Sequence, residues 1–214
     1  MIKEKTEKIE QIISTIETRI SEINNKYRKG PGLYFYRKII KLRSIYKSIK
    51  TFLYKKENIE ALYATLLSWD MNCRGAKMKY YNEFENNVIN CLPCFLKIEN
   101  LSKKNFIDLP VLNVILKESY NRLDVMLTNS KFVSNAKILH FLFPKLLMPM
   151  DGTNTLSYFY KNTGESLNKY IEIINFQFEV MHCTKNLNQY LDNTWNITIP
   201  KMIDNSIILI EVKV

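Results

Sequence analysis

The 214-residue sequence contains little glycine and little proline, 5 and 6 residues respectively. Tight turns depend on these residue types, and folds made of many short strands need many such turns. Their scarcity therefore favours long helices over a β-sandwich or barrel. With 46% hydrophobic and 24% charged residues, the composition predicts an all-α, mainly helical globular fold.

The sequence also lacks an apolar run of about 18 residues, the length needed for a membrane-spanning helix. Its N-terminus is charged and has no apolar segment of the kind found in signal peptides. We therefore expect a cytoplasmic protein without a membrane-spanning segment.

Cysteine and histidine are scarce, with four and two residues. Cys91 and Cys94 have the spacing of a redox pair or of half a zinc site. No second close pair completes a zinc site, and no preceding strand is expected, as a thioredoxin-like redox motif requires. We interpret the cysteines as buried thiols and expect neither metal nor cofactor, with a metal site as the alternative.

Acidic residues are absent between Lys26 and Lys56. This stretch, the basic stretch, contains eleven cations, whereas the whole chain has a net charge of +10. Each cation that neutralises a phosphate releases condensed counterions, so nucleic acid is the predicted partner, with DNA favoured over RNA. The alternative is a solvated basic face, or one that meets acidic lipid or protein. The predicted nucleic-acid-binding residues are Arg37, Lys38, Lys41, Arg43, Lys47 and Lys50.

The N-terminal part, residues 1–29, is predicted to be a long amphipathic helix that ends at Gly30-Pro31-Gly32. A helical domain, residues 33–214, follows it. The helix carries apolar residues in alternating steps of four and three, the seam of a coiled coil. This seam predicts either a homodimer through residues 9–27 or packing against the chain's own body. Its members are Ile9, Ile13, Ile16, Ile20, Ile23 and Tyr27.

Further helices are predicted at residues 76–90, 108–127 and 166–181, with Asp108 as the N-cap of the second. After Pro200 the chain changes character. The β-branched run 207–214 predicts a short C-terminal strand, which could form a hairpin with residues 195–199.

Three ionisable residues, Lys137, His140 and Asp151, lie in the most hydrophobic part of the sequence, residues 133–160. Ser134 is predicted to cap a helix that ends at Pro144, and the next helix can begin after Asp151. Because buried polar groups are costly unless paired, the three residues are candidates for a site. Alternatively, the lysine reaches solvent, the histidine is a satisfied core residue and the aspartate caps a helix.

A second charged cluster, Asp70 and Arg74, lies beside Trp69. At helical spacing these two charges would form an i,i+4 ion pair at a helix joint; the alternative is a wall of the pocket that holds Asp151. The predicted pocket residues are Trp69, Asp70, Arg74, His140, Phe143 and Tyr158.

The order of features in residues 133–160 resembles the centre of helix-hairpin-helix DNA glycosylases. In that family a hairpin leads into a helix that opens with a lysine, and a proline-containing link then leads to an aspartate at the next helix start. Lys137 would match the lysine and Asp151 the aspartate. The hairpin glycines of the family are replaced by Val133, Ser134 and Asn135, and the interval of 14 positions is roughly one helical turn shorter.

The resemblance implies that a base is flipped out of the duplex into an aromatic pocket. It also implies that Lys137, with a pKa lowered by burial, attacks the sugar carbon while Asp151 stabilises positive charge on the sugar. We therefore predict a helical nucleic-acid-binding protein with a glycosylase-like core. The alternatives are a base-excision glycosylase that uses both residues, and a protein–protein interaction module that dimerises through its N-terminal helix.

Overall fold

Helices account for every regular element of the computed structural model, which describes residues 2–27, 29–71 and 77–211. This confirms the all-α prediction. Two 3-10 helices are present, η1 (Ile20–Glu22) and η2 (Leu187–Tyr190). The α-helices are α1 (Ile2–Arg19), α2 (Ile23–Lys26), α3 (Pro31–Ile45), α4 (Ile49–Leu53), α5 (Lys56–Ser68), α6 (Tyr81–Asn90), α7 (Leu92–Ser102), α8 (Leu109–Arg122), α9 (Phe132–Leu142), α10 (Asn154–Tyr160), α11 (Leu167–Cys183) and α12 (Ile199–Glu211).

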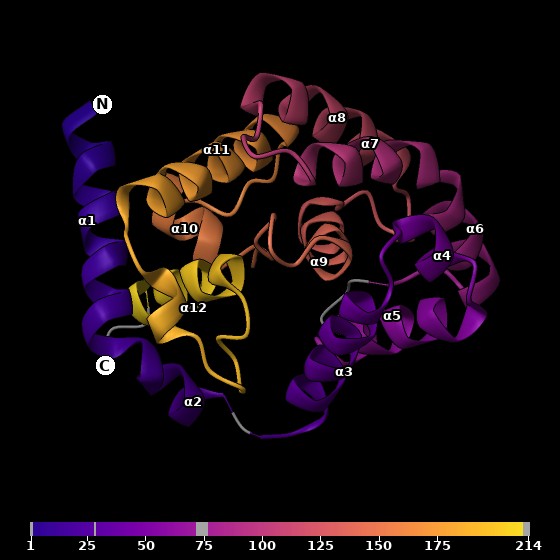
Figure 1. Ribbon diagram of the computed structural model, residues 1–214, viewed down its shortest axis with the longest axis horizontal. Coiled ribbons are helices and arrows are strands. Elements are labelled where there is room, and N and C mark those ends of the chain that lie inside the picture. Colours follow the sequence, from indigo (N-terminus) through magenta and orange to yellow (C-terminus); the bar gives the residue numbers. More distant parts are fainter. Residues whose placement is uncertain (1, 28, 72–76, 212–214) are drawn as a thin grey trace.

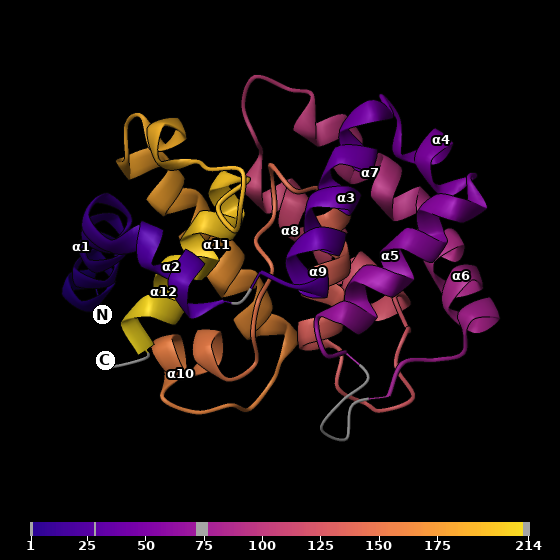
Figure 2. The same cartoon turned by 90° about the horizontal axis from the view of Figure 1, so that it is seen from below.

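The helices form two groups with α8 and α9 between them (Figures 1 and 2). One group contains α1, α2, α10, α11 and α12, in which α1 and α10 pack against α12. The other contains α3 to α7, in which α3 packs against α5. The chain crosses from the first group to the second between α2 and α3, and it returns between α9 and α10. These two crossings lie close to the candidate site.

The apolar seam of the N-terminal helix is buried inside the chain. Three members of the seam, Ile16, Ile20 and Ile23, are at most 7% exposed, as is the neighbouring Ile12. The other members are partly buried and pack against the same core; they are Ile9, Ile13 and Tyr27. Helix α1 packs against α12 and α11, so the two ends of the described chain share one core. The structure therefore shows packing of this seam against the chain's own body, the intrachain alternative.

Residues 207–211 of the predicted C-terminal strand are helical, so the predicted strand and hairpin are wrong for them, and residues 212–214 lie outside the described part of the chain. Helix α12 is buried at every position from Pro200 to Leu209 because α1, α10 and α11 surround it. Its isoleucines have high β propensity, but propensity is a weak preference that tertiary packing routinely overrides. Pro200 is the second residue of the helix, where a missing N–H costs little.

Helices α6 and α8 are shorter than the helices predicted at residues 76–90 and 108–127. Residues before α6 and after α8 pair in an isolated antiparallel bridge, Met78 with Met126. The connection from α8 to α9 therefore runs over residues 123–131 and is not a tight hairpin. Asp108 caps α8 as predicted. Ser134, however, lies inside the first turn of α9, where its Oγ donates to the Lys131 carbonyl.

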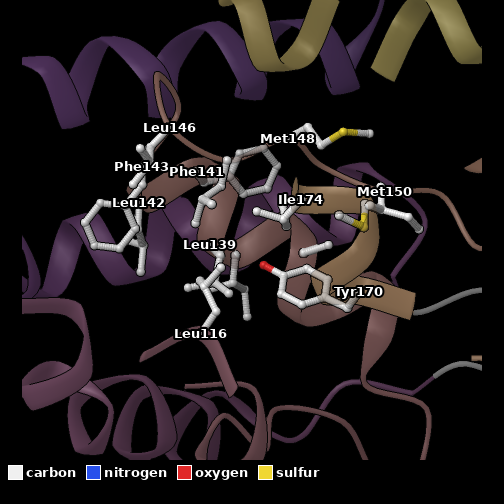
Figure 3. Close-up of a cluster of buried hydrophobic side chains, with 14 of the residues drawn as sticks. Leu116, Leu139, Phe141, Leu142, Phe143, Leu146, Met148, Met150, Tyr170 and Ile174 are labelled. Atoms are coloured by element: carbon white, nitrogen blue, oxygen red, sulfur yellow. The ribbon is translucent and has the colours of Figure 1, made fainter. Parts of the chain in front are cut away.

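The link between α9 and α10 is folded back over α9. Figure 3 shows Leu146 and Met148 of the link lying with Phe141, while Tyr170 and Ile174 of α11 close the other side of the cluster. The Gln177 side chain fixes the backbone of this link, since its Nε2 donates to the Leu146 carbonyl (2.8 Å) and its Oε1 accepts from the Met148 N–H (2.8 Å).

Candidate functional site

A cavity of about 450 Å³ lies at the two chain crossings. One wall comes from the connection between α2 and α3, a second from the end of the α9–α10 link, and a third from α12 and the residues before it. The cavity therefore forms only when both ends of the chain are assembled. Its lining is Tyr27, Gly30, Pro31, Gly32, Ser68, Trp69, Asp70, Lys137, Pro149, Met150, Asp151, Trp195, Lys201, Asp204 and Ile208.

Lys137 lines this cavity and is half-buried. Its ammonium donates to the Trp69 carbonyl (3.0 Å), and it lies 5.6 Å from the centroid of the Trp69 ring. Burial lowers the pKa of Lys137 from 10.5 to about 8, and the nearby carboxylate of Asp151 opposes part of this shift. With this pKa, about a tenth of the Lys137 side chains are neutral amines at pH 7.

Asp151 lines the same cavity and also caps a helix. Its Oδ1 accepts from the backbone N–H groups of Thr153 (2.8 Å) and Asn154 (2.7 Å) at the start of α10. These bonds are those of an N-terminal cap, which satisfies otherwise unpaired amides. Asp151 therefore caps α10, as the alternative prediction states. It also lines the same cavity as Lys137.

Trp69 and Asp70 form the wall next to Lys137. Helix α5 ends at Ser68, and Asp70 has the left-handed backbone conformation (φ 59°), which aspartate tolerates better than most residues. The Trp69 Nε1–H donates to the Gly32 carbonyl (3.1 Å), which ties the end of α5 to the start of α3. Asp70 lies beyond the end of α5, so it is not part of the helix that the predicted i,i+4 ion pair with Arg74 requires. Arg74 itself lies outside the described residues.

A buried ion pair on α12 was not predicted. Lys201 Nζ lies 2.6 Å from Asp204 Oδ2, and the two side chains are only 5% and 4% exposed. Desolvation raises the pKa of Asp204, while the neighbouring ammonium of Lys201 opposes the shift. Lys201 and Asp204 are two opposite charges at i,i+3 spacing within an apolar segment. This spacing predicts an ion pair only if residues 199–211 are predicted to be a helix.

Aromatic rings complete the cavity. Trp195 lies 5.2 Å from Tyr27 and 6.2 Å from Trp69, measured between ring centroids. These two tryptophans are the only ones in the sequence, and both line the cavity. Trp195 was not predicted, because nothing in its sequence neighbourhood connects it to cavity residues that lie far earlier in the chain.

Two predicted pocket residues lie elsewhere. Phe143 packs against Phe95 on the far end of α9, at a centroid distance of 6.2 Å. Tyr158 donates its hydroxyl hydrogen to the Lys8 carbonyl (3.1 Å), on the side of α10 that faces α1. Neither lines the cavity.

His140, a third predicted pocket residue, is a buried structural residue behind the cavity. Its Nδ1 lies 2.7 Å from the Leu147 carbonyl, which can only accept, so Nδ1 carries the hydrogen and Nε2 accepts from the Tyr36 hydroxyl (3.2 Å). Burial lowers the pKa of His140 to about 3, so the ring is neutral. The histidine holds the α9–α10 link in place and thereby positions Asp151.

A surface groove of about 1020 Å³ adjoins the cavity, and Gly30 lines both. We call it the α3 groove. Helix α3 supplies one side and residues 193–197 supply the other. Four exposed cations line it, and none of its described lining residues is acidic. These cations are Lys29, Arg37, Lys38 and Lys41.

The other predicted nucleic-acid-binding residues are placed differently. Arg43 is directed into the protein, where its guanidinium donates to Glu99 Oε1 (3.1 Å) and to the carbonyls of Leu142 and Tyr46. With 12% of its side chain exposed, Arg43 is held by partners inside the protein, and it does not line the α3 groove. Lys47 and Lys50 do not line the α3 groove.

The three described cysteines, Cys91, Cys94 and Cys183, show no arrangement for metal, and Cys73 lies outside the described residues. Cys91 and Cys94 are buried and not joined by a disulfide, and burial raises the pKa of Cys91 to about 12, which keeps the thiol protonated. Within residues 2–27, 29–71 and 77–211, no three His, Cys, Asp or Glu side chains come together as metal ligands would. None of the helices in this part of the chain has the length and apolarity to cross a membrane.

The site as a whole combines a basic groove with an aromatic cavity that holds two lysines and three aspartates. Such a cavity can stack a planar guest, hydrogen-bond its edge and present an amine to it. Comparisons of the chain with protein-family models, with curated proteins and with solved structures found no match.

Proposed function

We propose that the protein binds nucleic acid along the α3 groove and receives one unstacked base in the adjoining cavity. The observation that carries this proposal is the direct contact of the two features at Gly30. A strand that follows the groove cations passes the mouth of an aromatic cavity. Nucleic-acid-binding sites commonly combine these two parts, a basic path for the backbone and rings for the bases.

The α3 groove suits a phosphate backbone. Its four cations are solvent-exposed, and Tyr34 and Ile45, which also line it, are 61% and 64% exposed. Exposed cations bind phosphates through counterion release, and exposed apolar groups can contact sugars and bases. A phosphate chain would meet few competing acids here, since none of the described residues lining the groove carries a carboxylate.

The cavity suits a base. Its volume falls within the roughly 300–1,000 Å³ of ordinary small-molecule sites. Its aromatic walls, Trp69, Trp195 and Tyr27, offer stacking worth about 1–3 kcal/mol per base. A base that is already unpaired enters at a lower cost than a paired one, since no duplex has to be opened.

The test is a titration of end-labelled single-stranded and duplex DNA at several salt concentrations, followed by anisotropy and by tryptophan fluorescence. We expect affinity to fall linearly on a log–log plot against salt, and fluorescence to be quenched because both tryptophans lie in the cavity. Affinity that does not change with salt would contradict the groove, and binding without quenching would contradict the cavity.

Base excision is the second candidate, and the state of Lys137 is the observation that favours it. A neutral amine could attack the sugar carbon as the glycosidic bond breaks and the base leaves with the bonding electrons. The attached nitrogen would pass a proton to the departing base, and the sugar ring would then open to an imine that borohydride can reduce. The carboxylate of Asp151 would stabilise the positive charge on the sugar. Borohydride should trap a covalent complex with DNA that Lys137→Met lacks. Absence of trapping with any damaged or undamaged duplex would leave the protein as a binder.

A further inference from the structure

A second pocket lies at the far end of the α3 groove and has a volume of about 390 Å³. We call it the link pocket. The end of α3, residues 142–146 and residues 197–198 line it. Ile40, Ser44 and Ile197 line both the α3 groove and the link pocket. The two hollows are therefore continuous with each other, as the groove and the cavity are at Gly30.

The same two segments wall the cavity, the α3 groove and the link pocket. Helix α3 lines the cavity with Pro31 and Gly32, the groove along most of its length, and the link pocket at its end. The facing segment, residues 193–198, lines the cavity with Trp195 and the other two hollows with Ile197. The three hollows thus follow one another along α3 in the order of its residues.

The charge of this surface suits a polyanion over its whole length. Lys145, which lines the link pocket, is exposed. Like Lys38 and Lys41 in the groove, it forms no ion pair within the described part of the chain. Arg43 also lines the link pocket, but Glu99 offsets its charge at 3.1 Å. None of the described residues lining this pocket is acidic, so Lys145 extends the row of groove cations.

We propose that one single strand of nucleic acid occupies the cavity, the α3 groove and the link pocket together, with its backbone running from the groove cations to Lys145. The link pocket is then a second binding subsite for the same strand. This inference rests on the proposed function, because it extends the surface that the strand follows and states which form of nucleic acid that surface takes.

The lining of the two hollows beyond the cavity favours a single strand over a duplex. Tyr34 and Ile45 are 61% and 64% exposed in the groove, and Pro144 and Leu146 add apolar groups in the link pocket. A duplex keeps its base faces stacked inside, so it brings only phosphates and sugars to such groups. A single strand brings its phosphates to the lysines and its base faces to the apolar and aromatic groups.

The length of α3 sets the number of nucleotides. A helix rises about 1.5 Å per residue, so the 15 residues of α3 span about 22 Å. A stacked strand rises about 3.4 Å per nucleotide, so about six nucleotides reach from the cavity to the link pocket, and fewer suffice in an extended strand. A trimer is too short to bridge this distance. It binds best in the groove, where four exposed cations lie against one in the link pocket.

Lys145→Glu tests the link pocket with strands of two lengths, a thymidine dodecamer and a thymidine trimer. At low salt we expect the variant to bind the labelled dodecamer about tenfold more weakly than the wild type, because a phosphate contact is replaced by repulsion. The slope of log affinity against log salt should become shallower by about 0.7 for the dodecamer. The trimer, measured by competition with the labelled dodecamer, should change by less than about twofold, since it lies outside the link pocket.

The matched control is Lys117→Glu, which makes the same charge change at an exposed position on α8. It should leave the salt slope unchanged. A thermal melt of both variants checks folding, which exposed substitutions should not disturb. A mixed-sequence dodecamer, alone and annealed to its complement, tests the choice of partner, and the single strand should bind more tightly to the wild-type protein.

The outcomes separate the inference from the proposed function. An unchanged dodecamer affinity in Lys145→Glu overturns the inference, and so does an equal loss in Lys117→Glu, because net charge then explains it. Equal weakening of trimer and dodecamer also overturns it, since no contact at the link pocket is needed. A duplex that binds as tightly as the single strand overturns the choice of partner. Failure of the wild-type protein to bind any strand at low salt overturns the proposed function itself.

Discussion

The cations of the α3 groove and those of the cavity lie on either side of Gly30, but the protein holds them differently. Lys38 and Lys41 project into solvent, whereas Lys137 is half-buried, Lys201 is buried, and both are hydrogen-bonded to the protein. In the groove, charge is inexpensive to maintain because water solvates it. In the cavity, desolvation has to be offset by partners. The same residue type is thus held by water in one region and by protein partners in the other.

This difference predicts different responses to the medium. Exposed charges are screened by salt within about 10 Å at 0.1 M, so the groove should respond to ionic strength. Enclosed charges are screened much less but are sensitive to the loss of a partner and to protonation. Substitutions in the two regions should therefore change different measurements.

The largest expected effect is the loss of one partner in the cavity. Asp204→Ala leaves the ammonium of Lys201 buried without its carboxylate, which should lower the free energy of unfolding by about 3–5 kcal/mol. Urea denaturation measures this. The double variant Lys201→Met with Asp204→Leu is the matched control, because it removes both charges and should be close to neutral. Equal losses in the two variants would show that packing, and not charge, sets the stability here.

Charge reversal in the α3 groove should leave stability nearly unchanged and weaken binding. Lys38→Glu with Lys41→Glu should reduce affinity for single-stranded DNA by about tenfold or more at low salt. For each phosphate that the variant no longer neutralises, the slope of log affinity against log salt should become shallower by about 0.7. The matched control reverses two exposed lysines on other segments, Lys117 and Lys185. Equal weakening by the control would show that net charge alone attracts the strand.

Helix α3 contains both exposed cations, such as Lys41, and a cation held inside the protein, Arg43. It lies two residues after Lys41, but it is bonded to Glu99 and to two carbonyls inside the protein. Arg43→Gln should therefore cost about 2–3 kcal/mol of stability and leave the salt slope of the folded protein unchanged. A shallower salt slope with full stability would return this residue to the binding surface.

Two residues that line the cavity, Lys137 and Asp151, could be predicted from the sequence. Lys137 and Asp151 were identified because charged residues in an apolar segment have to be explained, and the two prolines between them make the link turn back. The same argument could not separate Arg43 from Lys41. Both occur in a run without acids, and the carboxylate that binds Arg43, Glu99, is supplied by a helix far along the chain.

The other half of the cavity depends on packing that the sequence does not reveal. The β-branched run 207–214 predicts a strand, and no helix is predicted over the residues just before it, so nothing in the prediction places Lys201 and Asp204 on a common face. As a helix surrounded by three others, the same tail brings these two side chains to the cavity. Local preference decided the prediction, whereas long-range burial decides the structure.

Removing the cavity lysine should stabilise the protein. The pKa of Lys137 is about 8 in the folded state and 10.5 when the chain is unfolded, so below pH 8 the folded state holds a buried cation. Wild-type stability should therefore rise as pH increases from 8 towards 10.5, where the folded state releases this proton first. Lys137→Met should raise the free energy of unfolding by about 1–2 kcal/mol at about pH 7, allowing for the lost hydrogen bond. The gain should shrink at about pH 9.5, and Lys145→Met, at an exposed position, should show neither effect.

The smallest expected change in stability is that of Asp151→Asn, and it separates the two roles of this residue. Asparagine caps a helix about as well as aspartate, so the free energy of unfolding should change by less than about 0.5 kcal/mol. The carboxylate, however, raises the pKa of Lys137 more than any other neighbouring charge does. Its removal should move the midpoint of Lys137 acetylation, followed by peptide mass spectrometry, to a lower pH than in the wild type. Asp70→Asn is the matched control, because its carboxylate has the weakest of these influences and asparagine also tolerates the left-handed conformation found there. If the two variants shift the midpoint equally, the carboxylate of Asp151 does not act on Lys137 specifically, and capping is the only role left for it.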